Sequence, residues 1–117
     1  MIIAVDFDGT VVDHRYPEIG PDAPGAVETL HKLSNTGHSL ILWTMRSAVH
    51  LDDAVRWYVD RKLPLFGINR NPGQSIWTSS PKVYAQIYID DAAYGCPLIH
   101  PLGFNRPCVN WAAIHIV

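Results

Sequence analysis

The sequence predicts one α/β domain over residues 1–117, a Rossmann-like three-layer sandwich with a mainly parallel sheet. Short, unbroken apolar runs alternate along the chain with segments whose apolar residues recur at helical spacing, a pattern typical of strands joined by crossover helices. Several apolar runs end abruptly in acidic or hydroxyl residues, as strands buried on both faces of a parallel sheet do. With 117 residues, 48% of them apolar, the chain has the size and apolar content of a single core.

The N-terminal third of the chain predicts a strand followed by a helix. Residues 2–5 read Ile-Ile-Ala-Val, an unbroken apolar run that ends at Asp6. Alanine, valine and leucine then recur at helical spacing over residues 22–36, which predicts an amphipathic helix. Asp22 has the side chain of an N-cap, and Gly37 is typical of the residue at which a helix stops.

The middle of the chain repeats this pattern. A second apolar run, residues 39–43, ends at Thr44, and Ser47 can cap the amphipathic helix that follows. A third short apolar run, residues 65–68, predicts the next strand, and the turn-rich residues 69–73 come directly after it.

The remaining elements are shorter. We expect a short helix over residues 81–86, a fourth strand at residues 87–89 and an edge strand near residues 98–100. Three prolines punctuate this tail, so the pattern assigns no element to residues 111–117. Right-handed crossovers between parallel strands would bring the polar residues that end the strands to one edge of the sheet.

The composition limits the classes of partner. Nine basic and eleven acidic residues give a net charge of −2, and no basic run marks a surface for extended nucleic acid or acidic membranes. Cys96 and Cys108 match no zinc-binding spacing, which favours reduced thiols. The N-terminus lacks the features of a secretory signal, and no apolar run reaches membrane-spanning length. We therefore expect a cytoplasmic protein without a membrane partner.

Acidic residues follow two of the predicted strands. Asp6 and Asp8 follow the first strand, and Asp90 and Asp91 follow the fourth. Carboxylates that converge at one edge of a sheet would repel one another without a cation, and oxygen ligands favour a hard metal, here Mg²⁺. We expect Asp6 and one or both of the later pair to bind it.

The loop after the first strand also carries groups suited to phosphoryl transfer, which needs a positioned nucleophile and neutralised phosphate oxygens. Asp6 is positioned as the nucleophile. Asp8 could protonate the leaving oxygen and later deprotonate the hydrolytic water. Gly9 allows the backbone to turn sharply beneath a phosphate, and Thr10 adds a hydroxyl to this substrate-binding loop.

Two further side chains could contact the phosphate. Thr44 ends the second predicted strand, where its hydroxyl could donate to a phosphate oxygen. Lys82 lies eight residues before Asp90, about the length of a short helix plus a strand, and could place a positive charge between Asp6 and the phosphate. We count both as candidate catalytic residues.

The segment Asp-Phe-Asp-Gly-Thr at residues 6–10, taken with Thr44, Lys82 and the pair Asp90-Asp91, resembles the four-motif signature of the haloacid dehalogenase (HAD) superfamily of phosphohydrolases. The order of the motifs along the strands carries the resemblance as much as the residues do. It implies a HAD-like fold and an aspartyl-phosphate intermediate on the first acid of the segment.

The resemblance also implies roles for two residues near the metal and the phosphate. The backbone carbonyl of Asp8 would complete the metal ligands. An acid at this position accompanies phosphatases and phosphomutases in the superfamily. Arg46 follows Thr44 by two residues, as in branches with a Thr-x-Arg stretch, where the arginine helps to hold the substrate phosphate or the leaving group.

The spacing leaves no room for the cap domain that superfamily members acting on small metabolites usually carry. Residues 11–43 are taken up by a loop, a helix and a strand, and residues 45–81 by a helix, a short strand and one loop. An open site suits the phosphate of a large or macromolecular substrate, or a site covered by a neighbouring copy in a homo-oligomer. Nucleic acid is expected only as a terminal-phosphate substrate. The loops at residues 11–21 and 69–81 are the expected specificity elements.

The sequence thus predicts a Mg²⁺-dependent phosphomonoester hydrolase with an open, capless site. Three alternatives stay open. A non-catalytic domain could keep the fold as a binding or scaffold surface. A phosphotransferase or phosphomutase would use the same groups but would have to keep water from the aspartyl-phosphate. A receiver-type regulatory domain has a similar set of residues, although in a different order along the chain.

Overall fold

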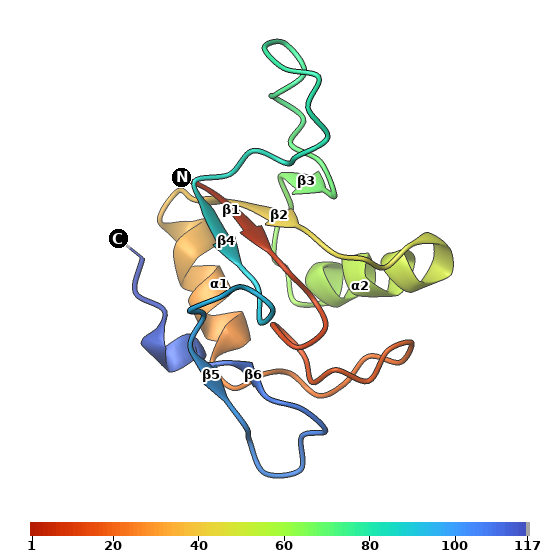
Figure 1. Ribbon diagram of the computed structural model, residues 1–117, viewed down its shortest axis with the longest axis vertical. Coiled ribbons are helices and arrows are strands. Elements are labelled where there is room, and N and C mark those ends of the chain that lie inside the picture. The colour runs from red at the N-terminus through yellow and green to blue at the C-terminus, as the bar shows by residue number, and fades with distance from the viewer. Residues whose placement is uncertain (117) are drawn as a thin grey trace.

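A four-stranded parallel sheet organises the chain in the computed structural model, which describes residues 1–116 (Figure 1). The sheet has the order β3-β2-β1-β4, so that β1 pairs with both β2 and β4. The strands are β1 (Ile2–Val5), β2 (Ser39–Leu42), β3 (Gly67–Ile68) and β4 (Ile87–Ile89). The predicted α/β class is confirmed: this is a small fold with a parallel sheet, flanking helices and no extra domain among the described residues. Both α-helices lie on one face of the sheet, so they do not supply the third layer of the expected sandwich.

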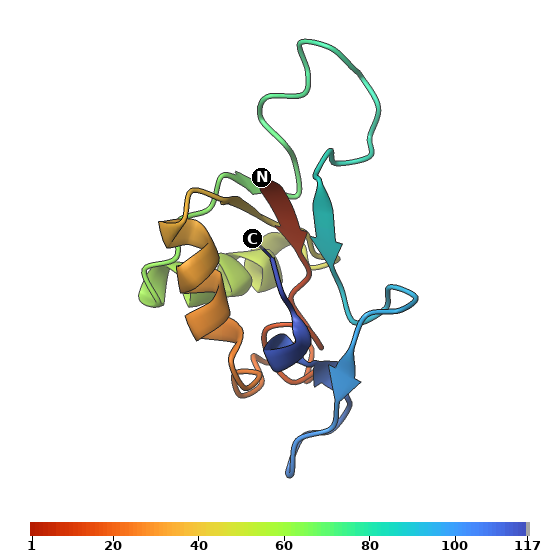
Figure 2. The same ribbon diagram turned by 90° about the vertical axis from the view of Figure 1, so that its left-hand side faces the viewer.

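Two helices cover one face of the sheet. Helix α1 (Ala26–Asn35) connects β1 to β2, and α2 (Ala48–Asp60) connects β2 to β3. Because both connections move along the sheet in the same direction, right-handed crossovers place both helices on the same side of it (Figure 2). The hydrophobic core lies between the sheet and these two helices, where buried residues of the strands meet the apolar faces of the helices. Strands β1 and β2 contribute Ile3, Val5, Leu40 and Leu42 to this core.

The boundaries of the helices differ partly from the prediction. Helix α1 begins after Gly25, which adopts a left-handed conformation with φ of 79°, so the expected N-cap Asp22 is wrong. Asp22 instead accepts hydrogen bonds from Trp57 of α2 and from Arg61, the residue that follows α2. Gly37 with φ of 95° follows the end of α1, which confirms the expected stop.

The connection from β3 to β4 forms an ordered loop, and the short helix expected over residues 81–86 is absent. The buried amide of Gln74 donates to two carbonyls of the loop and accepts the N–H of Tyr84. Asn71 donates to the carbonyl of Tyr84. Because side chains already satisfy these backbone groups, the segment gains little from helical pairing. The loop projects beyond the end of the sheet at which β1 and β4 begin (Figure 1).

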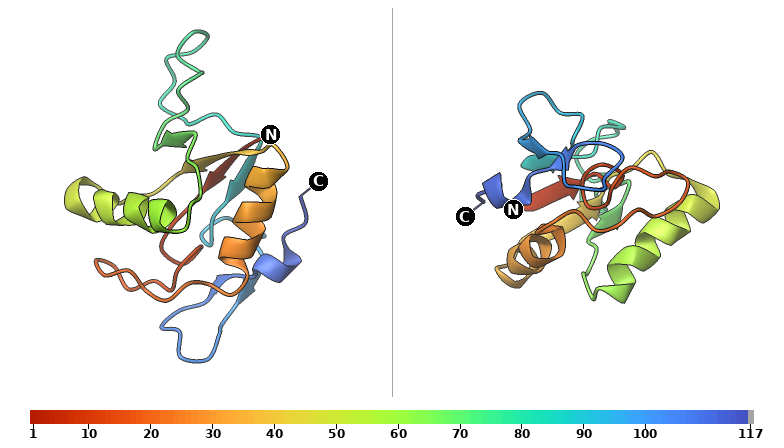
Figure 3. Two further views of the ribbon diagram at one scale, coloured as in Figure 1. Left: turned by 180° about the vertical axis from the view of Figure 1, so that it is seen from behind. Right: turned by 90° about the horizontal axis from the view of Figure 1, so that it is seen from below.

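The C-terminal segment packs against the loop that follows β1. Strands β5 (Leu98–Ile99) and β6 (Cys108–Val109) form a separate antiparallel pair, so the expected strand exists but does not extend the main sheet. A 3₁₀ turn at Trp111–Ala113 follows. Figure 3 shows this hairpin at the end of the molecule where β1 and β4 finish. The indole of Trp111 donates to the carbonyl of Thr10 over 2.7 Å, which fixes the tail there.

Two expectations about the composition can be compared with the fold. Cys96 and Cys108 are free thiols. Among residues 1–116, neither helix combines the length and the apolar character that crossing a membrane would require. Residue 117, the last residue of the segment to which the sequence pattern assigns no element, lies outside the described residues.

Candidate functional site: an acidic cluster at the carboxyl edge of the sheet

Three carboxylates meet where β1 and β4 end. Val5 and Ile89 are register partners, and the N–H of Asp6 donates to the carbonyl of Ile89 over 2.9 Å. The residues that follow the two strands are therefore held side by side. Oxygen atoms of Asp6, Asp90 and Asp91 all lie within 4.8 Å of one another. The convergence expected from the sequence is present in the structure.

Thr10 ties the two acidic segments together. Its buried hydroxyl donates to Asp6 over 2.9 Å and lies 3.4 Å from a carboxylate oxygen of Asp91. The same hydroxyl accepts the backbone N–H of Asp91 at 3.2 Å. A hydroxyl has one proton, so these contacts use its capacity as a donor. In this geometry Thr10 organises the acids.

Gly9 lies directly against Asp91. Its φ of 84° is the left-handed conformation that favours glycine, and a Cβ atom at this position would overlap the carboxylate of Asp91. The backbone turns tightly here, since the N–H groups of Thr10 and Val11 both donate to the carbonyl of Phe7. Only glycine allows the acidic cluster to approach the loop this closely.

The electrostatics of the cluster favour a bound cation. Burial, contact with Asp91 and the charge of Asp90 raise the pKa of Asp6 to about 8. Burial also raises the pKa of Asp90, and the neighbouring Asp91 adds to the rise. Three carboxylates this close cannot all be ionised without a compensating positive charge. A donor set made only of carboxylate oxygens fits a hard divalent cation, so this cluster could hold a metal ion.

Asp8 is separate from the cluster and forms an ion pair with Arg46. The two carboxylate oxygens of Asp8 accept from Nε and Nη2 of Arg46 at 2.7 and 2.8 Å. Both side chains are mostly buried. The carboxylate of Asp8 is not one of the three clustered acids. The resemblance implies a metal ligand only at the backbone carbonyl of Asp8.

A cavity of about 350 Å³ opens over Asp6 and Asp8. It also includes Thr44, whose hydroxyl accepts the N–H of Arg46 at 3.1 Å and whose own N–H is held by Asn69. Among the described contacts the hydroxyl proton of Thr44 is uncommitted, so it can be donated to a ligand. The complete lining is Asp6, Asp8, His14, Tyr16, Thr44, Met45 and Arg46.

The sequence did not single out Tyr16, Met45 or Asn69. Tyr16 and Met45 form the rim of the cavity and are 51% and 97% exposed. The sequence signal that could have pointed to Tyr16 is its position in residues 11–21, the loop expected to set specificity. Asn69 adopts a left-handed conformation with φ of 53°, for which asparagine is one of the better-suited residues, but its contact with Thr44 is long-range and leaves no local pattern.

Lys82 is not brought to this cavity. It is exposed in the loop before β4, and its ammonium lies 5.7 Å from the centroid of the Tyr88 ring. This loop leads into the start of β4, whereas the acids follow the end of that strand.

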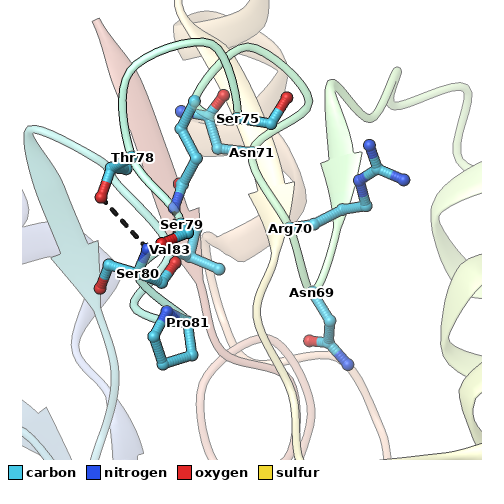
Figure 4. Close-up of a pocket in the computed structure, with 10 residues that line it drawn as sticks. Asn69, Arg70, Asn71, Ser75, Thr78, Ser79, Ser80, Pro81 and Val83 are labelled. Carbon is cyan, nitrogen blue, oxygen red and sulfur yellow. Dashed lines mark hydrogen bonds between the residues drawn. The ribbon is translucent and has the colours of Figure 1, made fainter.

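A second hollow of about 290 Å³ lies inside the same loop (Figure 4). The figure shows Arg70 pointing away from the hydroxyls of Thr78 and Ser80, and the buried amides of the loop bind its own backbone. This hollow is the interior of an ordered loop.

Comparison with known proteins gives a relative but no activity. No protein family model matches the chain, and no curated protein matches it significantly. A solved structure of a conserved protein from Bacteroides thetaiotaomicron is 45% identical in sequence, with a TM-score of 0.76. The match covers 81% of this chain and 78% of that protein. An identity this high over most of both chains reflects common descent as well as a common fold.

Proposed function

We propose a function for this chain on the premise that it belongs to the family of the conserved Bacteroides thetaiotaomicron protein. The proposal is a Mg²⁺-dependent phosphomonoester hydrolase of the HAD type that works through an aspartyl-phosphate. The observation that carries it is the cluster of Asp6, Asp90 and Asp91, whose oxygens lie within 4.8 Å of one another. A fourth acid, Asp8, lines the same cavity as Asp6. A buried set of like charges is costly unless it binds a cation.

The metal site of the proposal uses the three clustered carboxylates and the backbone carbonyl of Asp8. Mg²⁺ suits it because this ion prefers oxygen ligands, takes few protein carboxylates and pairs readily with phosphate. When bound, the ion would neutralise the clustered acids and the negative charge of the substrate phosphate.

The proposed reaction has two steps. The cycle starts from the form of the enzyme in which Asp8 carries a proton. A carboxylate oxygen of Asp6 attacks phosphorus, the ester P–O bond breaks, and Asp8 gives that proton to the leaving oxygen. Asp8 then takes a proton from water, which attacks phosphorus and breaks the bond to Asp6, so that inorganic phosphate leaves. In both steps the hydroxyl of Thr44 donates a hydrogen bond to a phosphate oxygen.

The role expected for Lys82 requires the loop that carries it to move toward the acids. A Lys82→Met variant tests this part of the proposal separately. A large fall in the rate constant of hydrolysis would place the ammonium at the phosphate during the reaction. An unchanged rate would leave neutralisation of the phosphate to the metal and would remove Lys82 from the mechanism.

The proposed substrates are phosphomonoesters whose leaving group extends out of the site. The cavity is open, and its rim offers the exposed Tyr16 and Met45 for contact with an apolar or planar group. A large molecule with a terminal phosphate, including the end of a nucleic acid, fits such a site. A second copy of the chain that covers the rim in a homo-oligomer would favour smaller esters instead.

The test is phosphate release from a panel of phosphomonoesters with and without Mg²⁺. Wild type is compared with Asp6→Asn and Asp8→Asn, and Asp60→Asn, an exposed acid at the end of α2, serves as the matched control. We expect turnover only with Mg²⁺, in wild type and in the control. Metal-independent turnover, or full activity of Asp6→Asn, would refute the mechanism.

Two other outcomes would point to the alternative functions. Transfer of the phosphoryl group to a sugar with little hydrolysis would favour a phosphotransferase or mutase. No turnover on any ester, with no binding of Mg²⁺ by calorimetry, would favour a binding or scaffold protein.

A further inference from the structure

Arg46 is the polar side chain near the site whose hydrogen-bond donors are most completely satisfied within the protein. A guanidinium has five N–H donors, and the protein itself supplies an acceptor for each of them. Two donate to Asp8, and the other three donate to the carbonyls of Pro17, Glu18 and His50 at 3.0, 2.9 and 3.4 Å. Only 2% of Arg46 is exposed to solvent. No donor is left for a ligand in this geometry.

Two aromatic rings hold the guanidinium as well. Its central carbon lies 5.1 Å from the ring centroid of Phe7 and 5.1 Å from that of Tyr16. Phe7 is buried between the two catalytic candidates of the loop, whereas Tyr16 stands at the rim of the cavity. Arg46 therefore links the acidic loop after β1 to the separate segment of residues 16–18.

This arrangement differs from the role suggested by the resemblance to Thr-x-Arg branches. To hold a substrate phosphate, Arg46 would have to break charge-assisted hydrogen bonds to Asp8 or abandon backbone carbonyls. Breaking the ion pair would also leave a mostly buried carboxylate without its partner, in a cavity that Asp6 lines as well.

We propose that Arg46 is a positioning residue that holds the carboxylate of Asp8 and the rim segment at residues 16–18 as one unit, and that it does not bind the substrate phosphate. The inference rests on the proposed function, because it assigns to Asp8 the proton transfers that need a fixed carboxylate. Arginine is required for geometric reasons: its planar fork binds both oxygens of Asp8 and still reaches the carbonyls of Pro17 and Glu18. Lysine could keep the charge but not the fork.

The test separates binding from turnover in Arg46→Met and Arg46→Lys, with p-nitrophenyl phosphate as substrate and inorganic phosphate as inhibitor. A displaced Asp8 should lower kcat of Arg46→Met roughly 10²-fold, since misplacement of a reacting group by about 1 Å has effects of this size. KM and the inhibition constant of phosphate should change less than about threefold, because the lost contact is not with the phosphate. Arg46→Lys should fall between wild type and Arg46→Met.

The chain offers a matched control in Arg61. It forms a similar two-pronged pair with Asp22, at 2.8 and 3.1 Å, and lies 4.2 Å from the Trp57 ring centroid, but it does not line the cavity. Arg61→Met should keep the wild-type kcat. A rise in KM and in the phosphate inhibition constant of Arg46→Met, with kcat retained, would overturn the inference, and so would a wild-type kcat in Arg46→Lys.

A second measurement does not depend on activity. Amide hydrogen exchange over residues 13–20 should increase in Arg46→Lys or Arg46→Met compared with Arg61→Met, because the carbonyl contacts of the rim segment are lost. Unchanged exchange would overturn the inference even if the enzyme proved inactive on every ester. Absence of Mg²⁺-dependent turnover in wild type would instead refute the proposed function alone.

Discussion

Two carboxylates of the loop after β1 lie seven residues apart and have opposite electrostatics. Asp13 is fully buried, and burial by itself would raise its pKa. The backbone N–H groups of Asn105 and Arg106 and the guanidinium of Arg15 outweigh burial and hold the pKa of Asp13 below its ordinary value. Asp6 has the hydroxyl of Thr10 but faces two other carboxylates, and its pKa is raised to about 8.

The difference shows which buried acid is structural and which is available for chemistry. Asp13 accepts hydrogen bonds from Arg15 of its own loop and from Asn105 and Arg106 of the connection between β5 and β6, so its charge is already compensated by the fold. Asp6 accepts a hydrogen bond from the neutral hydroxyl of Thr10, but no cationic side chain among residues 1–116 forms an ion pair with it. Burial is common to both residues, and only the missing partner distinguishes the functional candidate.

The largest expected effect is on Mg²⁺ binding. The double variant Asp90→Asn/Asp91→Asn removes two charges from the cluster and should weaken Mg²⁺ binding at least about 100-fold, or about 2.7 kcal/mol. Asp13→Asn should leave the affinity unchanged, because its carboxylate is bound by the protein. Isothermal titration calorimetry at pH 7.5 measures both. Equal affinity in the double variant and wild type would mean that the cluster is not a metal site.

Gly9→Ala should perturb the cluster without changing its charges. The added Cβ overlaps the carboxylate of Asp91, so we expect a loss of about 3 kcal/mol in the free energy of unfolding, together with weaker Mg²⁺ binding. Gly103→Ala is the control, since Gly103 has the same φ of 84° but no atom lies within 4 Å of its added Cβ. It should lose only about 1 kcal/mol, from backbone strain. Equal losses in the two variants by chemical denaturation would show that the cluster does not constrain position 9.

Asp13→Asn should affect stability and leave the chemistry intact. An amide cannot accept from Asn105, Arg106 and Arg15 together, so donors that meet the buried carboxylate lose their acceptor at a cost of about 2 kcal/mol. The melting temperature should fall by roughly 8–12 °C for a chain of this size. The kcat of the folded variant should equal that of wild type. A fall in kcat at temperatures where the variant is folded would place Asp13 in the reaction.

The parallel sheet, the convergence of the acids and the place of Thr44 were predictable because they follow from local patterns. Buried apolar runs that end in polar residues mark both the strands and their carboxyl edge. Parallel pairing then brings Asp6 next to Asp90 and Asp91 without further information. The roles of these residues in catalysis remain predictions.

The failures share one physical cause, a side chain committed to a distant partner. Asp22 does not cap α1 because it binds Trp57 of α2 and Arg61, which follows α2. The helix expected over residues 81–86 is replaced by a loop that is hydrogen-bonded to the buried Gln74. Local spacing carries no trace of such contacts, so sequence patterns could not reveal that the donors of Arg46 are all in use.

The smallest expected effect is on the pH dependence of the unfolding free energy, to which Asp6 and Asp13 contribute with opposite signs. The pKa of Asp6 is raised from near 3.8 in the unfolded chain to about 8, so its protonation stabilises the metal-free fold. That contribution is complete below pH 3.8 and is lost as the pH rises to about 8. Asp13, whose pKa is lowered, contributes above the unfolded pKa and loses this contribution only in more acidic solution.

In EDTA, the unfolding free energy of wild type should therefore fall by at least about 1 kcal/mol more between pH 5 and 9 than that of Asp6→Asn, which cannot ionise. Saturating Mg²⁺ should abolish this difference in slope for wild type, because a bound cation favours the ionised acids. Urea denaturation at several pH values measures both effects. Identical pH profiles of wild type and Asp6→Asn in EDTA would show that the three acids are not electrostatically strained, and the contrast between Asp6 and Asp13 would then lose its functional meaning.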